Sequence, residues 1–202
     1  PSAVFCFLKS NESLSAPDIQ INFTPGTHQR GMQSTLENQA GFTMATWQHR
    51  PESYGYVRAR SQDPFKHPEI QPNYLAADTD QQVILAAIKI CRKLAQTEAL
   101  KPFVVEETFP SVACQNDNDL LNSAREIGQS IYHLMGTCRM GKRDDKTAVV
   151  DAELRVHGIK NLRVIDASIM PTMVSANLNA AVMMIAEKGA DMVLGKLSAK
   201  PH

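Results

Sequence analysis

A histidine placed just before a tight turn is the first residue in this chain that could do chemistry. His133 lies in the segment SIYHLMGTCRMG, residues 130–141, and is followed by Gly136, Cys138 and Arg139. Imidazole is the side chain best suited to accept a proton near neutral pH, so His133 is a candidate general base. A purely structural histidine is the alternative, and partner residues are needed to choose between the two.

Two asparagines in the segment VSANLNA, residues 174–180, are candidate partners. Asparagine is favoured at the start of a helix, so Asn177 or Asn179 is predicted to cap the last helix of the chain. The backbone N–H groups and the dipole at a helix start also stabilise negative charge, such as that on the pyrimidine edge of a reduced flavin. Two plain capping residues are the alternative.

Asp166 and Cys138 are further candidates with weaker signals. Asp166 ends an apolar segment and precedes Ala167, so its carboxylate could hydrogen-bond a sugar or ribityl hydroxyl of a cofactor, or cap the following turn. Cys138 follows His133 closely, but no third group is placed to orient a Cys–His pair. A hydrolase built on Cys138 is therefore a minor alternative.

Composition and charge argue against several classes of function. The 202 residues are 43% hydrophobic, and 21 basic residues balance 21 acidic ones, so the sequence lacks the basic excess typical of nucleic-acid binding. The four cysteines form no C-x-x-C pair, so no metal site is predicted, and they are expected to be reduced thiols of a cytoplasmic protein. No apolar run has transmembrane length. The chain starts without methionine, which predicts a processed protein or a piece of a longer one.

Apolar and alternating segments predict strands in both halves of the chain. In the first half these are residues 3–8, 19–23, 41–49 and 56–60, and residues 24–39 are predicted to be a turn and a polar loop. The segments 41–49 and 56–60 are predicted to pair across a turn that contains Gly55. Trp47 and His49 alternate on the third segment and are candidates for lining a pocket. In the second half, residues 149–156 and 162–166 are the predicted strands.

Helical spacing predicts three helices and, with the strands, an α+β fold. The first runs from a capping box of Thr79 and Gln82 to about residue 98. The second starts at Asn116 or Asp117. The third, residues 179–194, is apolar almost all round and is predicted to be buried. A shift from charged to small and apolar residues near Ile131 predicts a boundary there.

Several spaced motifs together resemble the glucose-methanol-choline (GMC) family of flavin oxidoreductases. They are His133-x-x-Gly136-Thr137-Cys138-Arg139-Met140-Gly141, then Leu162 to Pro171 (LRVIDASIMP), then Asn177-Leu178-Asn179-Ala180, preceded by Arg50-Pro51-Glu52-Ser53 and Asp63-Pro64. The resemblance implies an FAD-dependent enzyme that oxidises an alcohol. It implies that His133 is the catalytic base and that Asn177 pairs with it across the substrate hydroxyl. It implies contacts with FAD by Asp166, Ala167, Asn177, Leu178, Asn179 and Ala180.

The resemblance also divides the chain. Residues 1–130 would be part of a substrate domain, an antiparallel sheet with flanking helices, and residues 131–202 the closing strand and helix segment of an FAD-binding domain. The family's G-x-G-x-x-G fingerprint is not in the sequence. We therefore expect an N-terminal FAD-binding part as partner, and a fragment that alone binds FAD poorly and is inactive. Ala45 stands where choline-oxidising relatives tend to carry histidine, which argues against choline.

The sequence leaves two alternatives open. A folded module that binds substrate or assists assembly, without flavin, is the alternative to the enzyme. Attachment at the periphery of the inner membrane is the alternative to a freely cytoplasmic protein. If the last helix exposes apolar surface, a homodimer is expected.

Overall fold

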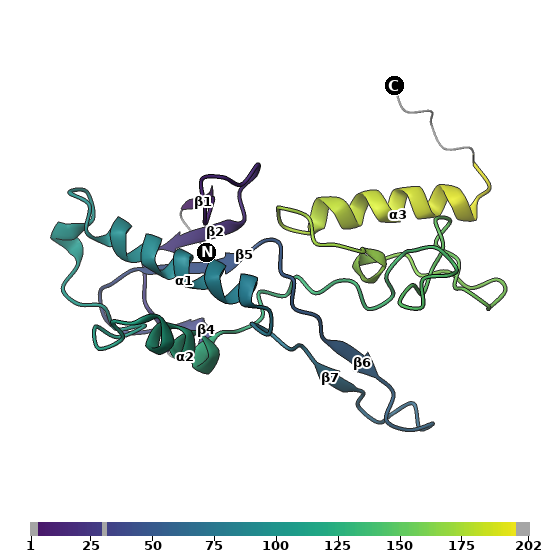
Figure 1. Ribbon diagram of the computed structural model, residues 1–202, viewed down its shortest axis with the longest axis horizontal. Coiled ribbons are helices and arrows are strands. Elements are labelled where there is room, and N and C mark those ends of the chain that lie inside the picture. The colour runs from purple at the N-terminus through teal and green to yellow at the C-terminus, as the bar shows by residue number, and fades with distance from the viewer. Residues whose placement is uncertain (1–3, 30–31, 197–202) are drawn as a thin grey trace. The chain divides into compact units, whose positions relative to one another are not determined.

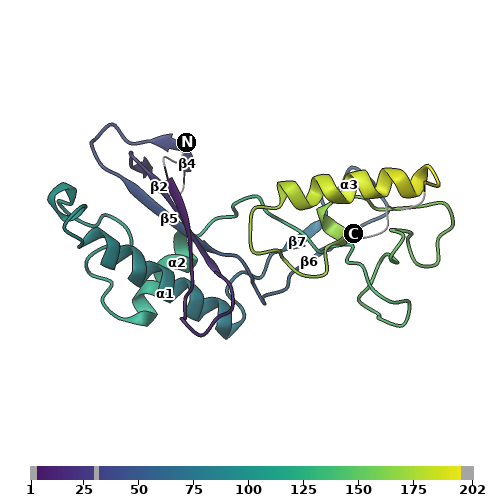
Figure 2. The same cartoon turned by 90° about the horizontal axis from the view of Figure 1, so that it is seen from above.

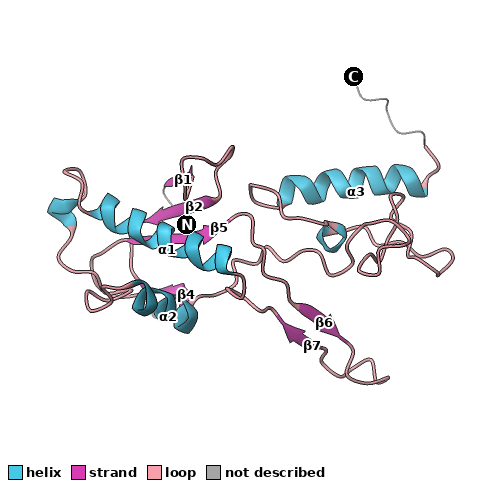
Figure 3. Cartoon of the chain, viewed as in Figure 1, coloured by secondary structure: helices cyan, strands magenta, loops and turns pink. Residues whose placement is uncertain are grey.

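The computed structural model describes residues 4–29 and 32–196, which form two compact units (Figure 1). Unit 1 comprises Pro1–Gly55 and Pro72–Ser130, and unit 2 comprises Tyr56–Gln71 and Ile131–His202. Small antiparallel sheets and helices together are consistent with the predicted α+β class (Figure 3). The assignment of residues 1–130 and 131–202 to a substrate domain and an FAD domain stays a prediction.

A three-stranded antiparallel sheet forms the centre of unit 1. Its strands are β1 (Val4–Leu8), β2 (Ile19–Thr24) and β5 (Thr43–Gln48), in the order β1-β2-β5. All three lie where the apolar pattern predicts strands. The predicted pairing of residues 41–49 with 56–60 is wrong, because β5 pairs with β2 instead. This arrangement lets β5 extend the sheet whose residues Ile19 and Ile21 are buried.

The remaining strands form two small hairpins. In unit 2, β6 (Tyr56–Arg58) pairs with β7 (Glu69–Gln71). In unit 1, β3 (His28–Gln29) pairs with β4 (Met32–Leu36), within a segment predicted to be a polar loop. The prediction of a loop is therefore wrong. The strands were not predicted because this segment has too little apolar alternation to indicate a strand.

Helix α1 (Asp78–Ala95) packs against the sheet and against α2 (Asp117–Ile127) (Figure 2). Toward the sheet, Val83 and Ala87 join Ile19 and Ile21 in one buried cluster. Toward α2, Leu85 of α1 packs against a second cluster, which also contains Leu120 and Leu121. Because α1 is covered on two sides, its buried residues spread over more of its surface than one face.

Helices α1 and α2 differ in how their first turns are capped. Helix α2 starts at Asp117, one of the two predicted starts, and Asn116 caps it, since its Oδ1 accepts a hydrogen bond from Asp119 N at 3.0 Å. The predicted capping box at Thr79 is wrong: the N-cap of α1 is Ala77, and Thr79 Oγ1 donates to Glu52 Oε2 at 2.7 Å. The helix also ends at Ala95, three residues before the predicted end.

A buried carboxylate joins the first turn of α1 to the segment Arg50-Pro51-Glu52-Ser53. Asp80 is 2% exposed. Its Oδ1 accepts from Gln48 Nε2 at 3.0 Å and from Glu52 N at 2.8 Å, and its Oδ2 accepts from Ser53 N at 2.9 Å and from Ser53 Oγ. Burial raises the pKa of Asp80, but these donors outweigh it, so the pKa lies below its ordinary value.

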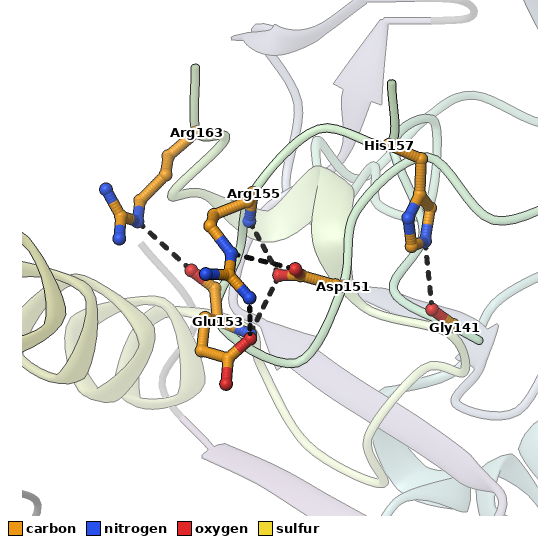
Figure 4. Close-up of polar contacts among 6 residues, drawn as sticks. All are labelled: Gly141, Asp151, Glu153, Arg155, His157 and Arg163. Atoms are coloured by element: carbon orange, nitrogen blue, oxygen red, sulfur yellow. Dashed lines mark hydrogen bonds and ion pairs between the residues drawn. The ribbon is translucent and has the colours of Figure 1, made fainter. Parts of the chain in front are cut away.

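In unit 2, the described residues from Ile131 to the start of helix α3 (Asn179–Val193) form loops and a short 3-10 helix and contain no strand. The strands predicted at 149–156 and 162–166 are wrong: the backbone there forms only isolated bridges, such as Val150 with Val156. The carboxylate of Asp151 accepts the N–H groups of Glu153 and Arg155 and the Nε of Arg155, which folds the chain into a turn (Figure 4). Such side-chain acceptors compete with strand pairing for the backbone donors.

Helix α3 (Asn179–Val193) lies over the core of unit 2, but most of it is exposed. Ile185 and Gly189 are its buried residues, whereas Met183 is 61% exposed. The prediction that this helix is buried is therefore wrong for this chain. A Cβ placed on Gly189 would lie 2.4 Å from Ile165 Cγ2, so glycine is what lets the helix approach this closely. The buried residues of this core are Val150, Leu154, Ile169, Met170, Leu178 and Ile185.

Neither a membrane-spanning helix nor a cluster of metal ligands is present in the part of the chain that the structure describes. None of the helices in that part of the chain has both the length and the apolar character needed to cross a membrane. No group of three or more His, Cys, Asp or Glu side chains in residues 4–29 and 32–196 is placed to hold a metal ion.

Candidate functional site

A direct hydrogen bond joins the two residues with the strongest chemical signal in the sequence. Asn177 Nδ2 lies 2.7 Å from His133 Nε2. In this geometry the amide nitrogen donates and Nε2 accepts, which corresponds to the imidazole tautomer with its proton on Nδ1. His133 is half-buried and Asn177 is exposed, so the pair lies at the surface of unit 2. The structure thus brings together His133 and Asn177, while their catalytic roles stay predictions.

Backbone hydrogen bonds fix the segment that follows His133. The N–H of Gly136 donates to Ala167 O at 3.3 Å, and that of Cys138 donates to Ser168 O at 2.9 Å. Gly136 has a φ of +85°, in the left-handed region that glycine adopts without strain. The histidine-bearing turn is therefore attached to the segment that contains Asp166.

Asp166 and Ala167 occupy the start of a short 3-10 helix, η2 (Ala167–Ile169). The Oδ1 of Asp166 accepts from Ser168 N at 2.7 Å, so the capping role considered for this aspartate is present. Asp166 is exposed, and η2 contacts α3. The two predicted FAD contacts at 166 and 167 are thus held by the element that packs against α3.

The start of α3 lacks the asparagine cap that the sequence predicts. The N-cap residue is Leu178, and no side chain caps the helix. The amide of Asn177 bonds to His133 instead, and Asn179 Nδ2 contacts Met183 Sδ at 3.8 Å. Leu178 is buried and anchors this turn, whereas Asn179 and Ala180 are exposed. The first N–H groups of α3 therefore keep the partial positive charge that suits an anion.

The other candidates have different surroundings. Cys138 is a half-buried free thiol, and the Nε2 of His133 bonds to Asn177 rather than to this thiol. In unit 1, His49 is 2% exposed and packs against Phe7, with 5.2 Å between the ring centroids. His49 is thus part of the packing and does not line an open pocket.

Two residues of interest carried no usable signal in the sequence. Tyr132, directly before His133, has a φ of +61°. Tyrosine has no special preference for that conformation, so the residue type does not predict it. Asp80 could have been noticed as one of two acidic residues in the first turn of α1, but its neighbour Asp78 is exposed and looks the same in sequence.

Comparison with known proteins gives a consistent result. Residues 51–186 match the family model described as GMC oxidoreductase. Human mitochondrial choline dehydrogenase is 42% identical over 191 residues, which cover 94% of this chain and 32% of that protein. The oxygen-dependent choline dehydrogenase of Escherichia coli O45:K1 is also 42% identical, over 94% of this chain and 33% of that protein. This chain thus spans about a third of the length of these relatives.

Solved structures show the same likeness. Pyridoxine 4-oxidase from Mesorbium loti superposes with a TM-score of 0.81 at 25% identity, over 97% of this chain and 38% of that one. A formate oxidase structure from Aspergillus oryzae RIB40, concerned with FAD modification, gives a TM-score of 0.77 at 30% identity, over 90% and 32% of the two chains.

The fold is shared with solved oxidase structures, as expected of part of a flavin-dependent oxidoreductase. The family match covers more than half of the residues, and the chain belongs to the GMC oxidoreductase family.

Proposed function

We propose that this chain supplies the catalytic base and its hydrogen-bonding partner to an FAD-dependent alcohol oxidoreductase. The observation that carries the proposal is the 2.7 Å contact between His133 Nε2 and Asn177 Nδ2. A neutral imidazole nitrogen and an amide donor at one place are what the removal of a hydroxyl proton requires. Membership of the GMC family supports the same chemistry.

In the proposed reaction the substrate hydroxyl enters between the two side chains. Its proton is transferred to Nε2 of His133. This nitrogen can accept the proton because it accepts the hydrogen bond from Asn177 in the structure. The alkoxide oxygen that develops accepts a hydrogen bond from Nδ2 of Asn177. The hydrogen bond seen between His133 and Asn177 is exchanged for these two, so both side chains are already aimed at one point.

The residues that would hold FAD surround the start of α3. The uncapped N–H groups of Asn179 and Ala180 fit the negative edge of a reduced flavin, and the Asp166 carboxylate is exposed beside η2. When bound, FAD would accept at its flavin N5 the hydride that leaves the alcohol carbon. The cradle for the ADP half would come from the N-terminal part of the full-length protein, which we propose as the partner of this chain.

The alcohol is open to direct test, and choline is the first to try because the relatives named above are choline dehydrogenases. The prediction against choline rests on Ala45, which is exposed on β5. A panel of choline, aromatic alcohols and pyridoxine would separate these substrate classes.

The test uses the full-length flavoprotein under anaerobic conditions, with flavin reduction followed by its visible absorbance. His133→Ala should slow reduction about 10²- to 10⁴-fold, and Asn177→Ala about 10²- to 10³-fold. His67→Ala, an exposed histidine of the β6–β7 hairpin, is the matched control and should leave the rate unchanged. Reduction near the wild-type rate in His133→Ala would show that the base is another residue.

The alternative is a module without flavin, and one spectrum distinguishes it. The purified full-length protein should retain a flavin absorption band after desalting. The 202-residue chain alone is expected to lose added FAD in the same procedure. A full-length protein that holds no flavin would support the non-catalytic module.

A further inference from the structure

The backbone of Tyr132, directly before His133, has a conformation that is unusual for a tyrosine. Its φ of +61° lies in the left-handed region, which costs L-residues other than glycine and asparagine conformational energy. Two of the other described non-glycine residues with positive φ, Leu75 and Leu154, pack their side chains into hydrophobic clusters. Leu154 is 3% exposed, whereas Tyr132 is 83% exposed. Burial of the ring therefore does not hold Tyr132 in this conformation.

The chain after Tyr132 is fixed at two nearby points. The ring of His133 bonds to Asn177, and the N–H of Gly136 bonds to Ala167 O. Only residues 133–135 lie between Tyr132 and the backbone anchor at Gly136. A change of Tyr132 from the left-handed to the extended region would rotate the peptide that leads into His133, and so short a segment would absorb the rotation by moving the ring.

We infer that Tyr132 is a positioning residue, whose left-handed backbone conformation aims His133 at Asn177. Strained conformations persist where the surrounding structure determines them, and they cluster at functional sites. The inference rests on the proposed function for its importance to catalysis. The hydrogen bond it concerns, however, exists without flavin or substrate, so it can be tested separately.

The test compares variants that share the loss of the ring and differ in backbone preference. Asparagine tolerates the left-handed region, whereas the β-branched valine strongly disfavours it. Tyr132→Asn and Tyr132→Val are therefore the matched pair. The readout is the scalar coupling across the hydrogen bond between Asn177 Nδ2 and His133 Nε2, measured by NMR on the ¹⁵N-labelled 202-residue chain.

Tyr132→Asn should keep the coupling. In Tyr132→Val the ratio of bonded to open forms should fall about tenfold relative to Tyr132→Asn, which corresponds to about 1.4 kcal/mol between the two conformations. Equal couplings in the two variants, whether kept or lost, would overturn the inference. An equal loss would assign the effect to the ring. If Tyr132→Val does not fold, Tyr132→Gly and Tyr132→Ala form the replacement pair, with the glycine variant keeping the bond and equal couplings again overturning the inference.

A second measurement addresses the reaction. In the full-length flavoprotein, Tyr132→Val should reduce flavin about tenfold more slowly than Tyr132→Asn at saturating alcohol, and both variants should retain flavin. Equal rates in the two variants would overturn a role in positioning the base. This result is distinct from failure of the proposed function, which would appear as normal flavin reduction in His133→Ala.

Discussion

Replacing Asp80 by asparagine should destabilise unit 1 while changing its size very little. Oδ1 and Oδ2 of this buried carboxylate each accept two hydrogen bonds, from Gln48 and Glu52 and from Ser53. An asparagine side chain keeps one acceptor oxygen, so one of the two pairs of donors is lost. With hydrogen bonds to a charged group contributing about 1.5 kcal/mol each, the loss is about 3 kcal/mol.

Urea unfolding followed by tryptophan fluorescence measures this loss. Trp47 is the only tryptophan and lies in β5 of unit 1, so its emission reports that unit. Asp78→Asn is the matched control, because it removes an exposed carboxylate from the same turn of α1 and should cost less than about 1 kcal/mol. If Asp80→Asn costs no more than Asp78→Asn, the argument from buried donors is wrong.

The same variant predicts a pH dependence with a definite sign. The pKa of Asp80 is lower in the folded state than its unfolded value of about 3.9. Its contribution to stability is therefore fully present above the unfolded pKa and is lost as the pH falls through the folded pKa. The difference in unfolding free energy between wild type and Asp80→Asn should be constant near pH 7 and should narrow below about pH 4. A difference that widens on acidification would contradict this.

Three further predictions concern other positions. Gly189→Ala should lower the melting temperature, because overpacking against Ile165 costs about 1–3 kcal/mol, and adding Ile165→Ala should recover part of the loss; a raised melting temperature would refute the close approach. Burial raises the pKa of Cys91 to about 12, so iodoacetamide at pH 8 should label it in urea but not in the native chain, as mass spectrometry would show. Asp166→Ala should lower the free energy of unfolding by about 1 kcal/mol, because Ser168 N loses its cap. Asp166→Ser can still cap and should restore stability but not FAD affinity. Equal FAD affinity in wild type and both variants would limit Asp166 to capping.

Local patterns predict the elements of unit 1 better than the way they pair. The apolar runs around Ile19 and Thr43 identify β2, whose first three residues are buried, and β5, whose residues are mostly half-buried. Their partners depend on which faces meet α1, and that is decided by contacts distant in sequence. The pairing of β5 with 56–60 was therefore wrong although both segments are strands.

In unit 2 the sequence predicts the residues of the site better than their surroundings. The resemblance carried by residues 133–141 and 177–180 named His133 and Asn177, and the structure shows them in contact. Pattern alone could not show that Asn177 would bond to a histidine and leave α3 uncapped, since both uses suit an asparagine before a helix. The exposure of Met183 was missed because the apolar character of a helix does not say which of its sides packs against the core.

The two units are interleaved along the chain, and this bears on how the protein can be divided. The hairpin Tyr56–Gln71 belongs to unit 2, although unit 1 supplies the residues on both sides of it. During synthesis this hairpin is made well before Ile131 and the rest of its unit, so its contacts must form late. A single cut between Ser130 and Ile131 would leave unit 2 without one of its two segments. A chimera that exchanges unit 1 between relatives should therefore transfer residues 1–55 and 72–130 as two blocks and keep the hairpin with the histidine and asparagine.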